Sequence, residues 1–183
     1  MAFPPMNFCS NCGAKVTLRV PPGDSLPRHV CDNCGTIHYR NPLVVVGTIP
    51  QWEDRILMCR RAIEPRHGLW TLPAGFMELG ETLAQAALRE TMEEARARVE
   101  LGEVFSLLSV PHVDQVHAFY SARLLDRDFA PGEETLEVAL FRESEIPWKA
   151  IAFRTISTTL RYFYEDRKSG AMRFHAGEIL PPK

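Results

Sequence analysis

The chain has 183 residues, of which 45% are hydrophobic, and its 21 basic residues nearly balance its 23 acidic residues. This length suits one domain of ordinary size with a small addition, and it excludes two full-size domains. The formal charge of −2 provides no global field for a polyphosphate backbone, and no run approaches the roughly 20 apolar residues of a membrane helix, so neither nucleic acid nor a membrane is the expected partner.

The first segment, residues 1–40, carries two CxxC pairs, Cys9/Cys12 and Cys31/Cys34, among many Pro, Gly, Asn and Asp residues. This spacing is typical of four-cysteine zinc ribbons, so we expect the segment to bind one structural Zn²⁺. The alternative is that the cysteines are merely buried. Because free thiols need a reducing compartment and the N-terminus lacks the basic start and apolar run of a secretion signal, we expect a cytoplasmic protein.

The predicted ribbon is expected to have a structural or dimerising role. Four cysteine ligands leave no open coordination position, which argues against catalysis at this metal. Its basic residues Lys15, Arg19, Arg28 and Arg40 are scattered among prolines, without an aromatic stripe for base stacking. The fifth cysteine, Cys59, stands alone in an apolar run and is interpreted as a small buried hydrophobe.

The remaining residues, 41–183, are expected to form the main domain, an α+β fold with a mixed sheet flanked by helices. The β-rich runs LVVVGTIPQW and RILMCRRAI are separated by Glu53-Asp54, which predicts a hairpin. Further strands are expected near 99–111, 115–125 and 137–141, and helices near 82–97 and 149–168. The second helix is expected to stop at Gly170.

The most informative segment begins at Gly75 and reads GFMELGETLAQAALRETMEEARA. On a helix, Glu90, Glu93 and Glu94 project within an arc of roughly 100°. Three carboxylates so close repel one another unless a cation neutralises them, and oxygen ligands suit Mg²⁺ or Mn²⁺. The opposite side, which we expect to pack, carries Ala84, Leu88, Met92 and Ala95.

Three glutamates on a helix are more often a solvated face, and the flanking residues favour a metal site here. A tight loop is expected at 72–75, where backbone carbonyls could join the metal shell. Gly80 and Thr82 punctuate the helix start. Arg89 can hold a neighbouring carboxylate through its bidentate fork.

This segment resembles the Nudix box, Gly-x5-Glu-x7-Arg-Glu-U-x-Glu-Glu-x-Gly-U, in which U is apolar. The matching positions are Gly75, Glu81, Arg89, Glu90, Glu93 and Glu94. Thr91 and Ala97 are weak versions of the apolar positions. Arg96 stands where the family usually has Gly, which leaves the geometry between helix and strand open.

The resemblance implies a Nudix α/β/α sandwich preceded by the zinc ribbon, and metal-dependent hydrolysis of a pyrophosphate bond. It also implies the role of each matching residue. Glu90, Glu93 and Glu94 would bind Mg²⁺ or Mn²⁺, with help from the Gly75 carbonyl. Arg89 would orient the glutamates, and Glu81 would brace the loop and the helix. No Ser or Cys is a candidate nucleophile, which agrees with metal-assisted attack by water.

The resemblance extends to the ribbon and to the runs YRNPLVVVG and LDRDFAPGEETLEVALF. It points to a Nudix subgroup that includes plant FAD pyrophosphatases and bacterial ADP-ribose pyrophosphatases. The implied substrate is a small ADP-linked dinucleotide, with FAD, cleaved to FMN and AMP, as the first hypothesis. ADP-ribose or NADH, also releasing AMP, is the alternative. Related hydrolases are often dimers, so a homodimer stays open.

Candidate substrate contacts lie on predicted loops and strand ends around the box. They are Trp70, Phe76, Arg60 and Gln115, with His112, His117 and Arg61 as further candidates. Each has a structural alternative: the aromatic rings can pack behind the loop, and the histidines can make local hydrogen bonds. Because neighbouring residues of a strand face opposite ways, one of the two arginines is expected to point to solvent.

The resemblance also implies a glutamate outside the box that positions water or completes the metal shell. Glu133, Glu134 and Glu137 are available in a loop that enters a strand. An acidic surface turn is the alternative for each. We favour Glu137 because it lies at the strand entrance, where its position is better defined.

Two other functions compete with small-molecule hydrolysis. An RNA-end hydrolase guided by the ribbon is disfavoured by the near-neutral charge, and a steep salt dependence of RNA binding would revive it. A non-catalytic nucleotide sensor with a degenerate Nudix fold is disfavoured because Glu90, Glu93 and Glu94 are all present.

Overall fold

The computed structural model describes residues 6–181, and the chain forms two compact units that divide between Pro42 and Leu43. Each unit is described by itself below. Within the described residues, neither long helix has the length and apolar character needed to cross a membrane.

The first unit is a small three-stranded antiparallel sheet in the order β1-β2-β3. Its strands are β1 (Val16–Arg19), β2 (Arg28–Cys31) and β3 (Ile37–His38). Two matching turns carry the four cysteines, and in each turn the glycine adopts a positive φ of 73°. The Gly13 amide donates to the Cys9 carbonyl, and the Gly35 amide donates to the Cys31 carbonyl, both at 2.9 Å. The two CxxC motifs therefore form equivalent tight turns.

The second unit is built on a mixed eight-stranded sheet, whose main path runs β10-β5-β4-β9-β8-β11. The strands are β4 (Leu43–Trp52), β5 (Arg55–Arg61), β6 (Trp70–Thr71), β7 (Ala74–Phe76), β8 (Val99–Val110), β9 (Gln115–Leu124), β10 (Thr135–Phe141) and β11 (His175–Glu178). The β4–β9 and β8–β11 pairs are parallel, and the other pairs are antiparallel. The expected mixed sheet is confirmed, and β4 and β5 form the expected hairpin.

The two central strands β4 and β5 separate soon after their hairpin. They pair only at Gln51↔Ile56 and Trp52↔Arg55. Beyond that point β6 pairs with β5 and β7 pairs with β4, so the segment between β5 and the first helix fills the opening. We expected a tight loop at 72–75, but Ala74 and Gly75 belong to strand β7. Gly47 permits this pairing, since a Cβ there would lie 2.4 Å from the Pro73 carbonyl oxygen.

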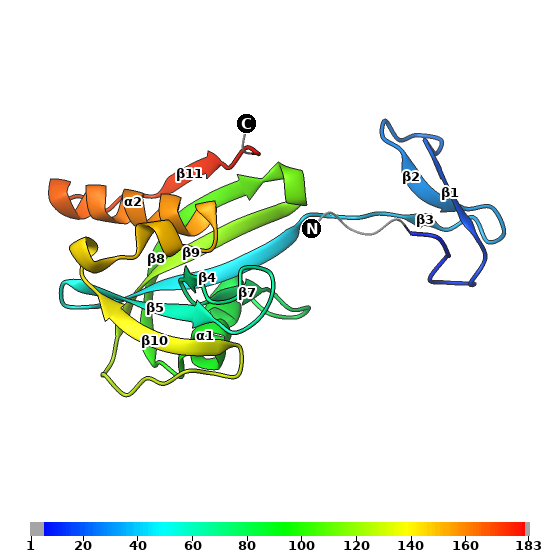
Figure 1. The fold of residues 1–183 in the computed structure, drawn as a ribbon. Coiled ribbons are helices and arrows are strands. Elements are labelled where there is room, and N and C mark those ends of the chain that lie inside the picture. The colour runs from blue at the N-terminus through cyan, green and yellow to red at the C-terminus, as the bar shows by residue number, and fades with distance from the viewer. Residues whose placement is uncertain (1–5, 182–183) are drawn as a thin grey trace. The chain divides into compact units, whose positions relative to one another are not determined.

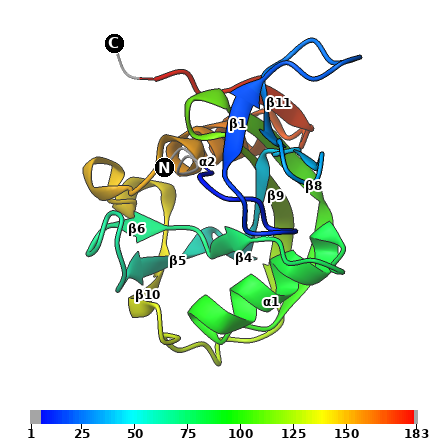
Figure 2. The ribbon, with the colours of Figure 1, turned by 90° about the vertical axis from the view of Figure 1, so that its right-hand side faces the viewer.

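One long helix covers each face of this sheet (Figures 1 and 2). Helix α1 (Leu83–Ala95) packs on the face that carries Val46, and helix α2 (Arg154–Ser169) packs on the face that carries Ile49. The side chains of successive strand residues point to opposite faces, so β4 and β5 contribute to both cores. Cys59 is buried on the α1 side with Leu57, as expected for a small hydrophobe. The α/β/α sandwich is confirmed.

The second helix begins later than its apolar pattern predicts. We expected a helix over 149–168, whereas Trp148–Ala150 forms a 3₁₀ turn (η3) and α2 starts at Arg154. The Ala152 amide instead donates to the Trp70 carbonyl at 2.8 Å, which holds this stretch extended against β6. Gly170 ends the helix with a φ of 73°, as expected.

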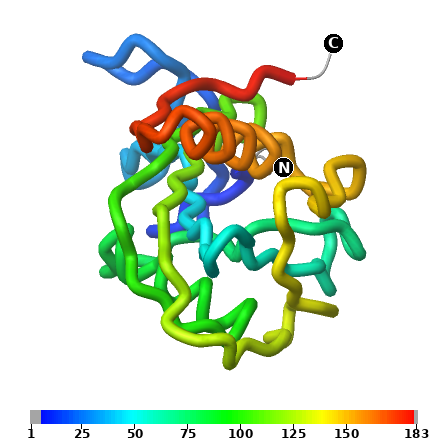
Figure 3. Tube along the Cα trace, turned by 90° about the vertical axis from the view of Figure 1, so that its left-hand side faces the viewer, coloured from blue at the N-terminus to red at the C-terminus, as the bar shows by residue number. Residues whose placement is uncertain are grey.

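Strand β11 follows α2 and pairs with β8, and it was not predicted from the sequence (Figure 3). Its anchor is Asp166 of α2, whose side chain is fully buried. The Asp166 carboxylate accepts from the Arg173 amide at 2.7 Å and contacts His175 Nε2 at 2.9 Å. The Tyr162 ring stacks on the His175 ring, with centroids 4.3 Å apart. The contacts of Asp166 in α2 therefore position β11. The sequence of β11 is short and weakly patterned, so it does not predict a strand.

Candidate functional site

Helix α1 begins and ends at defined signals. Thr82 is the N-cap: its hydroxyl accepts from the Gln85 amide at 3.2 Å, and the Gln85 side chain accepts from the Thr82 amide at 2.8 Å. This reciprocal pair is a capping box, which fixes the helix start. At the other end Arg96 adopts φ 51° and ψ 23°, the left-handed conformation that favours glycine. The glycine position of the box is therefore a helix-terminating position in this chain, occupied by arginine.

The buried side of α1 differs from the one that the apolar pattern predicts. Ala95 is fully buried, as expected, but Leu88 and Met92 are 41% and 39% exposed. Glu90 and Glu94 are only 8% and 7% exposed. An apolar arc does not specify which side meets the sheet, and here the small residues Ala86, Ala87 and Ala95 let the helix approach closely.

Arg89 connects the parts of the site. Its guanidinium donates to both Glu81 carboxylate oxygens, at 2.7 and 2.9 Å, and to the Phe76 carbonyl at 3.0 Å. It also donates to Glu90 at 2.7 Å and to Glu93 at 3.0 Å. One fixed cation thus joins the loop before the helix, the helix start and two of the candidate metal ligands.

Glu81 fastens the loop on its other side. Its carboxylate accepts from the Glu78 amide at 2.9 Å. Hydrogen bonds from Arg89 and then from the Glu78 amide lower the pKa of Glu81 to about 2. Glu81 is therefore ionised at neutral pH and serves as a brace between the loop and Arg89.

Glu90 and Glu94 are carboxylates held in a largely dry environment. Burial raises the pKa of Glu94 to about 8, although the Ala74 amide donates to it at 3.0 Å. Burial also raises the pKa of Glu90, in spite of its contact with Arg89. A Cβ at Gly75 would lie 2.3 Å from a Glu90 oxygen, so only glycine leaves room for this carboxylate. The Glu90 charge also raises the pKa of Glu94, and such crowded, buried carboxylates fit a hard divalent cation such as Mg²⁺ or Mn²⁺.

The loop before β10 rests on the C-terminal end of α1. The Ala130 amide donates to the Ala95 carbonyl and the Gly132 amide to the Glu94 carbonyl, both at 3.0 Å. A Cβ at Gly132 would lie 1.7 Å from the Glu93 carbonyl oxygen, so the loop packs directly on helix backbone. An isolated glycine before a strand was the only sequence signal of this contact.

The loop before β10 carries three glutamates, and the charge of Glu134 acts on the carboxylates of the box. Its charge contributes to the raised pKa values of Glu90 and Glu94, and its carbonyl accepts from the Ala62 amide at 2.8 Å. Glu137 instead pairs with Arg60 at 3.6 Å across the β5–β10 ladder. Glu134 thus acts electrostatically on the carboxylate cluster, whereas Glu137 pairs with the neighbouring strand.

The two arginines at the end of β5 point in different directions, as their positions predict. Arg60 donates to the Gly68 carbonyl and faces Glu137. The Arg61 guanidinium lies over the Phe153 ring, 5.2 Å from its centroid, and its charge partly offsets the raised pKa of Glu94. The charge of Arg61 therefore acts on the carboxylate cluster, whereas Arg60 was the arginine preferred from the sequence.

The aromatic and polar candidates for substrate contact are dispersed. Trp70 packs edge-on against Phe141, with ring centroids 4.8 Å apart, and belongs largely to the core on the α2 side. Phe76 is half exposed beside the box loop. Gln115 and His117 lie on one side of β9 and contact each other at 2.9 Å, while His112 lies in the exposed turn η1 (Pro111–Val113).

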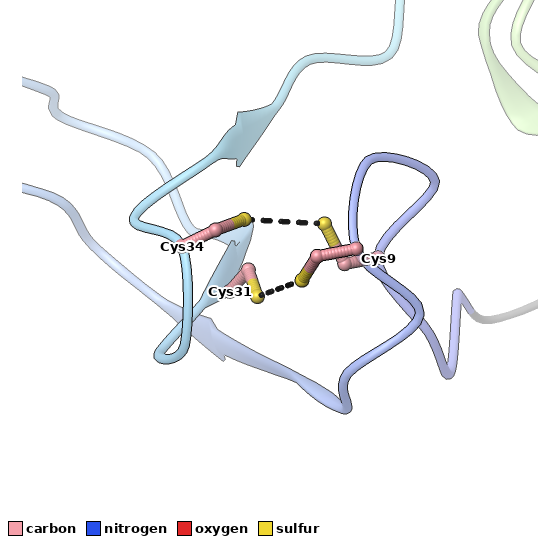
Figure 4. Close-up of side chains that lie close together, drawn as sticks. Cys9, Cys31 and Cys34 are labelled. Atoms are coloured by element: carbon pink, nitrogen blue, oxygen red, sulfur yellow. Dashed lines mark hydrogen bonds between the residues drawn. The ribbon is translucent and has the colours of Figure 1, made fainter.

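The four cysteines of the first unit converge on one point. Their sulfur atoms all lie within 4.8 Å of one another, with Cys9–Cys34 at 3.6 Å and Cys12–Cys31 at 3.5 Å (Figure 4). The Asn11 amide and His38 Nε2 contact the Cys9 sulfur at 3.4 and 3.3 Å. Four thiols with polar neighbours around them fit a closed tetrahedral Zn²⁺ site.

Both units of the chain match models of known protein families. A family model for the NUDIX domain matches residues 41–160, and a model described as the Nudix N-terminal zinc ribbon matches residues 7–40. The chain belongs to the Nudix family. A crystal structure of a NUDIX hydrolase from Nitrosomonas europaea is 56% identical and superposes with a TM-score of 0.93, covering 96% of this chain and all of that one.

Two curated Nudix relatives carry names that describe activities. An NAD-capped RNA hydrolase, NudC, from Photobacterium profundum is 31% identical over 77% of this chain and 52% of its own length. An ADP-ribose pyrophosphatase from Methanocaldococcus jannaschii is 29% identical over 60% of this chain and 67% of its own length. The chain spans about half the length of the Photobacterium relative.

Proposed function

We propose that this Nudix chain is a metal-dependent pyrophosphohydrolase that cleaves ADP-linked dinucleotides and releases AMP. One observation carries the proposal: Glu90 and Glu94 are buried beside the Gly75 loop, with Arg89 joining Glu90 to Glu81 and Glu93. Burial destabilises the ionised form of these carboxylates, and a bound cation would offset that cost. Carboxylates on a solvated acidic face would not need a cation.

Glu90, Glu93 and Glu94, with the Gly75 carbonyl, would hold Mg²⁺ or Mn²⁺. When bound, the metal supplies charge neutralisation of the diphosphate and activation of water for in-line attack. Arg89 and Glu81 are positioning residues, because they hold the glutamates and the loop.

For the glutamate that assists the attacking water, we propose Glu134 ahead of Glu137. The electrostatic contact of Glu134 with Glu90 and Glu94, and the fixed loop below it, support this order. Glu134→Gln should lower kcat more than Glu137→Gln does, and the reverse order would restore Glu137 as the better candidate.

We propose FAD as the first substrate to test and ADP-ribose as the second. FAD rests on the resemblance to plant FAD pyrophosphatases over nearly the whole chain, and ADP-ribose is supported by the name of the archaeal relative. Phe76, Gln115, Trp70 and the arginines of β5 are the proposed substrate contacts. NADH belongs to the same test, because several relatives are named for an NAD-linked substrate.

RNA ends rank below small dinucleotides. The relatives named as NAD-capped RNA hydrolases favour RNA, but the ribbon offers little free positive charge. Arg19 pairs with Asp32 at 3.0 Å, and Arg28 pairs with Asp24 at 2.9 Å.

We also propose that the ribbon binds Zn²⁺ as a structural element and that the protein works in the cytoplasm, where its clustered thiols stay reduced. Sedimentation would decide whether it forms a homodimer.

The deciding experiment incubates the chain with FAD, NADH, ADP-ribose, diadenosine polyphosphates and nucleoside triphosphates, with Mg²⁺ or Mn²⁺, and detects AMP. Glu94→Gln should lower kcat by about 100-fold or more, because a buried metal ligand is lost. Glu165→Gln, an exposed change on α2, is the matched control and should keep full activity. A chain that binds nucleotides but hydrolyses none of the panel would instead be a sensor.

A further inference from the structure

His117 lies in a row of paired residues that starts at the box loop. In the strand registers, Phe76 of β7 pairs with Val45 of β4, and Val45 pairs with His117 of β9. Paired residues project to the same face of a sheet, so the Phe76 ring and the imidazole share one face. Neighbouring strands are 4.7–4.9 Å apart, which places His117 about 10 Å from Phe76 along the sheet. The Phe76 carbonyl itself accepts from Arg89.

The imidazole of His117 is buried, and only one of its two ring nitrogens has a hydrogen-bond partner among the described residues. The residue is 9% exposed, and its Nδ1 has no hydrogen-bond partner among the described residues. Its Nε2 lies 2.9 Å from Gln115 Oε1. With the Gln115 oxygen toward the ring, Nε2 donates to it, and this tautomer carries its lone pair on Nδ1. A buried acceptor without a partner is destabilising, so a ligand that donates to it would remove this cost.

We propose that His117 Nδ1 accepts a hydrogen bond from a neutral donor on the nucleoside part of the substrate, a ribose hydroxyl or the exocyclic amine of the base. This inference rests on the proposed function and deepens it. A phosphate offers only acceptor oxygens and would repel the lone pair. Phe76, in the same row, belongs to the box segment, so a nucleoside that contacts both residues would lie beside that segment.

Two further features of this face support a nucleoside ligand. The Phe76 ring is 50% exposed in the same row, so one side of it is free to stack on a base. Burial lowers the pKa of His117 to about 4, so its imidazole is neutral near pH 7 and its lone pair is available. Gln115, on the same face of β9, holds the ring in the orientation that presents Nδ1.

The test compares wild type, His117→Leu and His117→Asn in the full chain, with AMP as the probe in the presence of Mg²⁺. His117→Leu removes the acceptor and should weaken AMP binding about tenfold, the usual range for one hydrogen bond. His117→Asn keeps an oxygen acceptor near the Nδ1 position and should recover part of the affinity. Thermal unfolding verifies that both variants fold.

Analogues of AMP identify the donor. The 2′-deoxy, 3′-deoxy and amine-free purine analogues each lack one candidate group. For the analogue that lacks the bonded group, wild type and His117→Leu should bind equally. Equal AMP affinity in wild type and a folded His117→Leu would overturn the inference, and so would a tenfold difference that persists with all three analogues.

A second readout separates this inference from the proposed function. In ¹⁵N-histidine NMR spectra, AMP should shift the Nδ1 resonance of His117 toward a hydrogen-bonded value, whether or not the chain hydrolyses dinucleotides. If wild type turns over no substrate but AMP shifts this resonance, the proposed function fails and the nucleoside site stands. If the chain hydrolyses a dinucleotide but AMP leaves the His117 resonance unmoved, the proposed function stands and the nucleoside site is refuted.

Discussion

Arg96 shows how a single residue can depart from a family pattern without changing the local structure. It occupies the left-handed region that ends α1, where an L side chain is strained and glycine is not. Its amide still donates to the Met92 carbonyl at 3.0 Å, as a helix-ending residue should. The side chain is exposed and lies outside the carboxylate cluster.

Arg96→Gly should therefore stabilise the protein by about 1 kcal/mol, because the left-handed conformation costs a non-glycine residue roughly that amount. The free energy of unfolding from urea titration measures the effect. Arg96→Ala is the control, since it removes the side chain but keeps the Cβ. An equal gain in both variants would assign the effect to the arginine side chain and contradict the backbone explanation.

A second prediction at this scale concerns pH and His117. Its folded pKa of about 4 lies below the unfolded value of about 6.5, so the unfolded chain binds a proton first as the pH falls. This group's contribution to stability should be constant above pH 6.5 and should decrease from there toward pH 4, by about 3 kcal/mol at most. Unfolding titrations at pH 7 and pH 5 measure the decrease, which should be smaller in His117→Asn. Parallel pH profiles for the two proteins would refute this.

At the scale of elements, a pair of buried hydroxyls joins helix α1 to strand β4. Thr91, at an apolar position of the box, is fully buried, and its hydroxyl lies 2.7 Å from that of Thr48. The Thr91 hydroxyl also donates to the Ala87 carbonyl at 2.7 Å. The expected apolar contact is thus replaced by a hydrogen bond between helix and sheet, which leaves the Thr48 hydroxyl dependent on Thr91.

Thr91→Val should destabilise the protein by about 1–3 kcal/mol, since it buries the Thr48 hydroxyl without a partner. The double variant Thr48→Val/Thr91→Val replaces both polar groups with apolar groups of similar shape and should recover most of this loss. Unfolding free energies of the four proteins in the cycle give the coupling. Additive single effects would show that the two hydroxyls act independently.

At the scale of the whole molecule, the chain combines a small unit with a cluster of four cysteines and a larger unit with its own core. The described part of the ribbon unit has few buried residues, among them Cys9, Val30 and Cys31, whereas the Nudix unit has apolar cores on both faces of its sheet. A segment of about 40 residues rarely folds without a disulfide or a metal. Metal binding should therefore control one unit and leave the other folded.

Cys31→Ser should remove the zinc and unfold residues 6–42, while the amides of β4, β8 and β9 keep their protection in hydrogen exchange. The physical reason is the loss of one of four thiolates from a closed site. Cys59→Ala, in the core of the second unit, should keep a full equivalent of zinc by metal analysis. A Cys31→Ser chain with an intact ribbon would disprove the structural role of the metal.

Patterns that depend on spacing along the chain were determined by the sequence itself. They include the zinc ribbon cysteines, the start of α1 at Thr82 and the six matching positions of the Nudix box, because a turn or a helix brings such residues together locally. The strands β4, β5, β8 and β9 follow from the same kind of pattern.

Only the tertiary structure decided which side of α1 is buried, that the charge of Glu134 acts on Glu90 and Glu94 while Glu137 pairs with Arg60, and that His117 shares a row with Phe76. These relations join segments that are 40 or more residues apart or depend on the register between strands. Register and packing are settled by contacts between elements, and no local pattern records them.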